Sequence, residues 1–257
     1  MKFERVRKFF TDNFSDQQYA LRRGAKWDDF TFEERTYKGW LLPYLFEIDY
    51  MFSRRWDYWA RTLLAGKLLN EPIPQIKFLD FPNQETMKNL RACMENYICH
   101  SVRFEDFLEW LLWGFGEQKE QARISTEVNE HWYRTFNMGL LIQYPYDYLG
   151  DILADTKAGK SYWSNPNAFY ATPHALVKMM VAMTMRKREI RGKNLRIGSV
   201  MEPCVGTGRF LMEASNHSLS LYGVDNDSMC VMACKVNGWL YVPWMVRSGS
   251  GIVKGLK

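Results

Sequence analysis

Two glycines in the stretch "SVMEPCVGTGRFLMEAS", Ser199–Ser215, stand where an apolar run ends and a helical pattern begins. Glycine allows a sharp turn and a close approach of the backbone to a ligand, and the start of a helix offers unpaired N–H groups. The loop around Gly206 and Gly208 therefore suits an anionic or carboxylate-bearing cofactor. It lacks the lysine and hydroxyl of a P-loop and the third glycine of the dinucleotide fingerprint, so neither of those sites is indicated.

Glu202 and Asp225 are the acids best placed to join this loop in one site, because each ends an expected strand. In parallel sheets, an acid about twenty residues beyond the glycines accepts hydrogen bonds from ribose hydroxyls, and Asp225 stands at this spacing. Glu202 suits an ammonium group. Ribose, ammonium and carboxylate occur together in S-adenosylmethionine, which is the cofactor that we expect.

The elements that must position these residues follow from the pattern of apolar residues. Up to Asp155, apolar and aromatic residues recur at helical spacing, with breaks at 70–85 and 137–150. A helix is expected from Pro173, and a strand, a helix, a second strand and a second helix follow over 195–240. We therefore expect an α/β protein with a mainly helical region over 1–155 and a parallel sheet with crossover helices over 156–257.

Three stretches carry a resemblance to a known family: "NAFYATPHALVKMM", "VMEPCVGTGRFLMEA" and "LYGVDNDSMCVMACKVNGWL". In this order they closely resemble the cofactor-binding half of the amino-group DNA adenine methyltransferases, especially the methylase subunits of type I restriction-modification systems. The resemblance covers about Asp147 to Lys257. It implies a partial class I methyltransferase sheet, similar to a Rossmann fold, and a role in DNA methylation with DNA as a partner.

The resemblance also implies where S-adenosylmethionine binds. The methionine end would be surrounded by Phe169, Tyr170, Thr172 and Pro173, with Thr172 at the carboxylate. The loop beneath it would be formed by Glu202, Cys204, Gly206 and Gly208. Asp225 would hold the ribose, and Asn226 would lie against the adenine. For Phe169 and Tyr170, ordinary helix packing is the alternative.

The chain differs from the family in the catalytic motif. The family's (D/N/S)PP(Y/F/W) motif, which holds the target amino group and stacks on the flipped base, is absent from this sequence, so no catalytic residue is assigned. The ending "GIVKGLK" resembles the third strand of the fold, but Leu256 stands where the family usually has an acid. Half a sheet would leave apolar edges open to solvent, which predicts a second protein chain that completes the fold, self-association or poor stability.

Composition and charge limit the remaining classes of function. The net charge of +5 permits contact with nucleic acid, and two places are candidates for it. For the cation-rich stretch Met185–Arg196 the alternative is the solvated end of a helix, and for the pair Arg54 and Arg55 it is helix packing. The first residues resemble no secretory signal and no apolar run could span a bilayer, so we expect a cytoplasmic protein without a membrane partner. The spacing of the five cysteines indicates no metal site.

Three functions compete on these grounds. The first is a fragment, or one part, of a split DNA adenine methyltransferase. The second is a non-catalytic regulator that binds the cofactor or nucleic acid through a degenerate methyltransferase scaffold. The third is a structural or interaction protein in which the glycine loop is only a tight turn.

Overall fold

A computed structural model describes residues 38–94, 102–117, 123–157, 169–190 and 198–247. Its first part consists of helices, as the apolar spacing predicts. These are α3 (Leu42–Phe52), α4 (Arg55–Ala65), α5 (Gln84–Met94), α7 (Phe104–Gly114), α8 (Thr126–Thr135), α9 (Met138–Gln143) and α10 (Tyr148–Lys157). The expected boundary between residues 155 and 156 falls in the last turn of α10.

Strands and helices alternate in the second part of the chain. The elements are α11 (His174–Ile190), β1 (Ser199–Glu202), α12 (Arg209–Ala214), β2 (Ser220–Gly223), α13 (Ser228–Tyr241) and α14 (Pro243–Val246). β1 and β2 pair in parallel, with Val200 opposite Leu221 and Met201 opposite Tyr222. In the described part of the chain this sheet has two strands, and the expected third strand at 251–257 lies outside it. The mixed α/β class is confirmed at this level.

The continuous helical pattern over Tyr44–Leu69 is divided in the structure, because α3 ends at Phe52 and α4 begins at Arg55. Between them Arg54 has a left-handed backbone, with φ of 57°. The buried carboxylate of Asp49 accepts hydrogen bonds from the backbone N–H groups of Arg55 and Trp56, at 3.2 and 2.9 Å. These bonds satisfy donors at the start of α4, so the chain can begin a new helix there although the apolar spacing continues.

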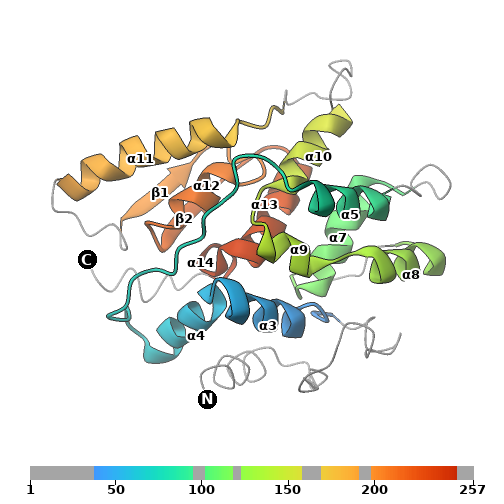
Figure 1. The fold of residues 1–257 in the computed structure, drawn as a ribbon, viewed down its shortest axis with the longest axis horizontal. Coiled ribbons are helices and arrows are strands. Elements are labelled where there is room, and N and C mark those ends of the chain that lie inside the picture. The colour runs from blue at the N-terminus through green and yellow to red at the C-terminus, as the bar shows by residue number, and fades with distance from the viewer. Residues whose placement is uncertain (1–37, 95–101, 118–122, 158–168, 191–197, 248–257) are drawn as a thin grey trace.

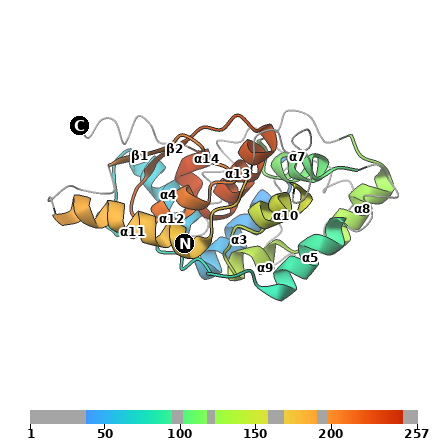
Figure 2. The same ribbon diagram turned by 90° about the horizontal axis from the view of Figure 1, so that it is seen from above.

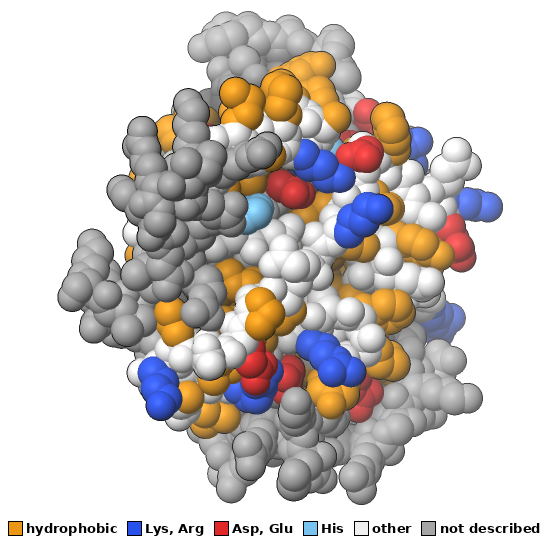
Figure 3. Space-filling model, turned by 60° about the vertical axis from the view of Figure 1, so that its left-hand side comes forward, with side chains coloured by type: hydrophobic (Ala, Val, Ile, Leu, Met, Phe, Trp, Pro, Cys, Tyr) orange, Lys and Arg blue, Asp and Glu red, His pale blue; other side chains and the backbone are white. Residues whose placement is uncertain are grey.

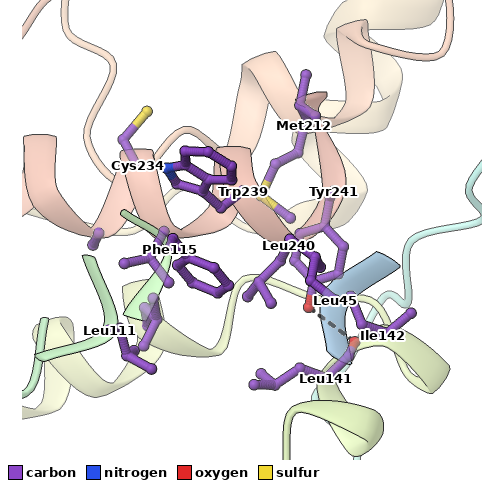
Figure 4. Close-up of a cluster of buried hydrophobic side chains, with 14 of the residues drawn as sticks. Leu45, Leu111, Phe115, Leu141, Ile142, Met212, Cys234, Trp239, Leu240 and Tyr241 are labelled. Carbon is purple, nitrogen blue, oxygen red and sulfur yellow. Dashed lines mark hydrogen bonds between the residues drawn. The ribbon is translucent and has the colours of Figure 1, made fainter. Parts of the chain in front are cut away.

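One cluster of buried side chains runs through both parts of the chain. Its centre is α13, which packs against α7, α10, α12 and α14. Trp239 of α13 stacks on Trp56 and on Phe115, with ring centroids 5.1 and 5.7 Å apart. The hydroxyl of Tyr241 donates to the carbonyl of Leu141 at 2.9 Å, as Figure 4 shows. The many aromatic residues therefore serve largely as core, and the helical part and the sheet share that core.

Residues 66–83, called the 66–83 segment below, cross the molecule from α4 to α5 without helix or strand (Figure 1). Asn216 binds this segment through both the N–H and the carbonyl of one residue, Ile76, as a neighbouring strand would. Its side-chain amide donates to the carbonyl of Ile76 at 3.0 Å, and its carbonyl accepts from the N–H of Ile76 at 2.9 Å. Farther along, the N–H of Leu79 donates to the carbonyl of Pro145 at 2.9 Å.

Arg55 is fully buried, so the expectation that it could contact nucleic acid is wrong. Its guanidinium donates to the carbonyls of Pro74 and Tyr241, both at 2.9 Å, and to the side chains of Ser215 and Asn216. The residue joins α4 to the 66–83 segment and to the ends of α12 and α13. Arg54 is exposed and lies over the ring of Tyr50.

α11 lies at one end of an elongated molecule and α8 at the other (Figures 1 and 2). The cation-rich stretch 185–196 continues α11 to Ile190, but its side chains beyond Met185 lie outside the described residues. No helix in the described ranges is long and apolar enough to cross a membrane.

One face of the sheet is open. Val200 and Leu221 are buried beneath it, whereas Met201 and Tyr222, which point the opposite way, are 60% and 44% exposed. Figure 3 shows hydrophobic side chains among charged ones on the side of the molecule that holds the sheet and α11. α11 adds its own exposed apolar side chains, those of Leu176, Met179, Met180 and Met183.

Candidate functional site

A pocket of about 770 Å³ lies where β1 and β2 end. Its walls come from the loops that follow the two strands, 203–208 and 224–227, and from the segment that leads into α11. The structure brings eight of the ten predicted cofactor-binding residues together here: Phe169, Tyr170, Thr172, Glu202, Cys204, Gly206, Asp225 and Asn226. Pro173 and Gly208 are not among the lining residues.

The two glycines of the loop have different tasks. Both have left-handed backbones, with φ of 53° at Gly206 and 89° at Gly208. A Cβ atom at Gly206 would stand 3.3 Å from the ring of Phe169, so this glycine lets the loop and Phe169 form adjoining walls of the pocket. At Gly208 a Cβ atom would stand 2.8 Å from the sulfur of Cys234, so this glycine lets the loop pack on α13.

Asp225 is fixed by the loop that it faces. One carboxylate oxygen accepts from the N–H of Gly206 at 2.8 Å, and the other from the N–H of Asp227 at 2.9 Å. A carboxylate has about four lone-pair positions, so acceptor capacity remains on both oxygens. Asp225 can therefore accept hydroxyl groups without giving up its own bonds. The N–H of Gly206, by contrast, already has its acceptor inside the protein.

The other acids of the pocket have distinct surroundings. Burial raises the pKa of Glu202, and a hydrogen bond from the backbone N–H of Cys204 partly opposes this rise. The side chain of Asp227 accepts from the N–H groups of Met229 and Cys230, so it caps α13. Asp227 therefore serves α13, whereas Glu202 and Asp225 are the carboxylates that were predicted to bind a ligand.

A buried ion pair supports the loop from behind. Arg209, which begins α12, donates through Nε to Asp147 at 2.9 Å and through Nη2 to Asp151 at 2.7 Å. Its Nη1 donates to the carbonyl of Thr172 at 2.8 Å. One guanidinium thus connects the glycine loop and the segment before α11, which both line the pocket, to the start of α10, which does not line it.

Asp147 completes this network, called the Asp147–Arg209 network below. Its carboxylate is fully buried and accepts from Thr207 Oγ1 at 2.5 Å, from Asn237 Nδ2 at 2.7 Å and from the N–H of Gly150 at 2.9 Å. Asn237 also donates to the carbonyl of Thr207 at 2.9 Å. The loop is therefore fastened to α10 and α13 by bonds to buried, charged groups, which are stronger than bonds between neutral ones.

This network could not be predicted from the sequence. Asp147 stands in "YDYLGDIL" and Arg209 directly follows the glycine pair, but nothing in the spacing of these residues pairs them. The need for a partner could have been predicted for both residues. Asp147 is an acid within an apolar stretch and Arg209 is a cation at the first residue of a buried helix, and buried charges need partners. Which partners they find depends on how α10 packs against α13.

Comparisons of the chain with protein-family models, with curated proteins and with solved structures each found no match.

Proposed function

We propose that this pocket binds S-adenosylmethionine and that the chain is the cofactor-binding part of a DNA adenine methyltransferase. The observation that carries the proposal is the convergence of eight predicted residues on one pocket. Phe169 and Asp225 are more than fifty positions apart in the sequence, yet both line it. On this proposal β1, α12, β2 and α13 are the first half of a class I methyltransferase sheet.

Size and charge support this cofactor. The volume of about 770 Å³ lies within the range of roughly 300–1,000 Å³ that is usual for small-molecule sites. Glu202, Asp225 and Asp227 bring three carboxylates to the lining, and Arg209 is the cation among the described lining residues. The guanidinium of Arg209 is already paired with Asp147 and Asp151. A pocket with this balance favours a ligand that carries positive charge, as the ammonium and sulfonium groups of S-adenosylmethionine do.

Each part of the cofactor has residues suited to it. Asp225 would accept the ribose hydroxyls with the lone pairs that its backbone bonds leave free, and Asn226 would lie against the adenine. Glu202 would receive the ammonium group. Thr172, with Phe169 and Tyr170 around it, would meet the carboxylate at the methionine end.

The bound cofactor would supply an electrophilic methyl group. The residues of this chain would hold and orient it, so their share in catalysis is positioning. The acceptor-binding motif (D/N/S)PP(Y/F/W) would come from a second protein chain that packs on the open face of the sheet, where Met201 and Tyr222 are exposed. DNA is the expected substrate of the completed enzyme.

The absence of that motif from the sequence favours one second candidate, a regulator that binds cofactor or nucleic acid without transferring a methyl group. The two functions separate in a single assay. Transfer of a labelled methyl group to adenine-containing DNA, measured when the chain is mixed with a protein that carries the motif, supports the enzyme. Binding without transfer in every such mixture supports the regulator.

The first test of the proposal is calorimetric titration of the whole chain with S-adenosylmethionine and with its demethylated product. Asp225→Asn removes a charged acceptor, and hydrogen bonds to charged groups contribute about 1.5–3 kcal/mol, so we expect affinity to fall by at least about tenfold. Glu71→Gln is the control, because it changes an exposed carboxylate in the 66–83 segment in the same way. Equal affinity of the Asp225 variant and the wild type, or no binding by the wild type, would contradict the proposal.

A further inference from the structure

A second pocket, of about 670 Å³, lies between α5 and α10 and is called the α5–α10 pocket. α5 contributes Met87, Lys88 and Arg91, which share one helix face by their spacing, and α10 contributes Ala154 and Asp155. The proposed function uses none of these side chains. The volume of the pocket is nevertheless within the range that is usual for small-molecule sites.

The two pockets meet at the segment before α11. Tyr170 and Ala171 line both of them, so the ring of Tyr170 stands between the two spaces. A group-transfer protein needs a place for the acceptor directly beside its cofactor. The α5–α10 pocket has that position relative to the proposed cofactor site.

Two exposed aromatic rings lie in the lining of this pocket or next to it in the sequence. Tyr170 is 81% exposed, and so is Phe81, which directly precedes Pro82 in the pocket lining. Among the described residues no other large hydrophobic side chain is as exposed as these two. Stacking on a nucleic-acid base uses such rings, and each stacked base contributes about 1–3 kcal/mol to binding.

The charges at this pocket suit a phosphate. Arg91 pairs with Asp155 at 2.9 Å, and both side chains are more than half exposed, so a ligand can share this guanidinium. Lys88 forms no ion pair with another described residue, which leaves its ammonium group available. The remaining acid, Asp151, is already occupied by Arg209 and by the hydroxyl of Tyr146.

We propose that the α5–α10 pocket binds one nucleotide of a nucleic-acid strand, with its base against Tyr170 and its phosphate at Lys88 and Arg91. This inference rests on the proposed function, because it gives the acceptor strand a place next to the cofactor. It gives the helical part of the chain a share in binding the acceptor strand, beside the motif that the second chain would supply. The sequence indicated contact with nucleic acid in this part only at Arg54 and Arg55.

Fluorescence anisotropy with a labelled single-stranded DNA of about ten nucleotides tests this assignment. The whole chain is compared with Lys88→Gln, Arg91→Gln and the matched control Lys67→Gln, an exposed lysine just beyond α4. Each of the first two variants should weaken binding by about tenfold and lower the slope of affinity against salt by about one, whereas the control should bind as the wild type does.

Calorimetry with S-adenosylmethionine on the same variants separates this inference from the proposed function. Unchanged cofactor affinity together with weakened DNA binding supports the α5–α10 pocket as the acceptor site. The inference is overturned if the wild type does not bind DNA, or if the Lys88, Arg91 and Lys67 variants all bind DNA equally well. Neither result would contradict cofactor binding at the first pocket. Loss of cofactor binding by the Lys88 or Arg91 variant also overturns it, because these residues would then serve the first pocket.

Discussion

Asp147 shows how a carboxylate can shape a pocket without lining it. It is fully buried and accepts hydrogen bonds from the loop, from α10 and from α13, whereas Glu202 and Asp225 line the pocket. Three or more bonds to one buried carboxylate offset much of the cost of burying its charge. The position of the glycine loop therefore depends on a residue that is about sixty positions away in the sequence.

At this scale the sequence indicated the residues that line the pocket better than those that support it. Gly206 and Asp225 follow expected strands, and local signals are enough to place both at the carboxyl ends of a parallel sheet. The partners of Arg209 are not local. They depend on which side chains α10 and α13 present to each other after packing, and neither helical spacing nor strand alternation contains that information.

His174, the first residue of α11, provides a prediction about pH. Its ring stacks on the ring of Tyr146, with centroids 4.2 Å apart, and its Nε2 atom has no hydrogen-bond partner among the described residues. Burial, with a smaller effect from Arg209, lowers the pKa of His174 from 6.5 to about 4. At pH values between about 4 and 6.5, His174 therefore binds a proton in the unfolded chain but not in the folded one. The stability that this difference provides is present above pH 6.5 and is lost as the pH falls towards 4.

We expect His174→Phe, which keeps the stacked ring, to remove this part of the pH dependence. Between about pH 7 and pH 5 the wild type should lose about 2 kcal/mol more of its free energy of unfolding than the variant does. Urea unfolding followed by tryptophan fluorescence at both pH values measures the difference. Parallel losses in the two proteins would show that His174 does not titrate in this way.

Among the elements, a break between helices was expected at 70–85, and most of it lies in the 66–83 segment, which has no helix or strand. The prolines predicted such a break, and this is confirmed, but its bounds differ, because α4 is already capped by Gly66 and α5 begins at Gln84. The sequence could not predict its path, because Asn216 anchors it and comes 140 positions after Ile76. The division between α3 and α4 was missed for a related reason: apolar spacing continues through Arg54, and the buried carboxylate of Asp49 decides where the new helix begins.

Asn216→Ala tests whether this anchor holds the segment in place. The change leaves the N–H and the carbonyl of Ile76 and one donor of Arg55 without their partner, all of them buried. We expect the free energy of unfolding to fall by about 2–3 kcal/mol, since unsatisfied buried polar groups are costly. Denaturant unfolding measures this loss.

Gln75→Ala is the matched control for that experiment. Gln75 is exposed and donates to the carbonyls of Ile73 and Asn216, so its loss should cost no more than about 1 kcal/mol. If the two variants were equally stable, the side chain of Asn216 would not be the anchor.

At the scale of the whole molecule, the open face of the sheet is one apolar surface that the described residues leave exposed. Exposed apolar side chains on paired strands favour association, and Met201 and Tyr222 stand opposite each other on this face. We expect the isolated chain to self-associate, with a sedimentation coefficient that rises with concentration. The double variant Met201→Lys and Tyr222→Lys should abolish the rise without lowering the melting temperature, because both side chains are exposed.

Leu64→Lys is the control for this prediction, since Leu64 is 56% exposed on α4, away from the sheet. It should sediment as the wild type does. Equal behaviour of the wild type and the double variant at all concentrations would show that this face takes no part in self-association.

The Asp147–Arg209 network also has a consequence for local unfolding. Because Arg209 is bonded to Asp147, Asp151 and Thr172 at once, detachment of the glycine loop would also break bonds to the start of α10 and to the segment before α11. We therefore expect loop, helix and segment to open as one cooperative unit, in the sense used for native-state hydrogen exchange. On the proposed function, substitutions in α10 would then change the affinity of the pocket at β1 and β2 for the cofactor without contacting it.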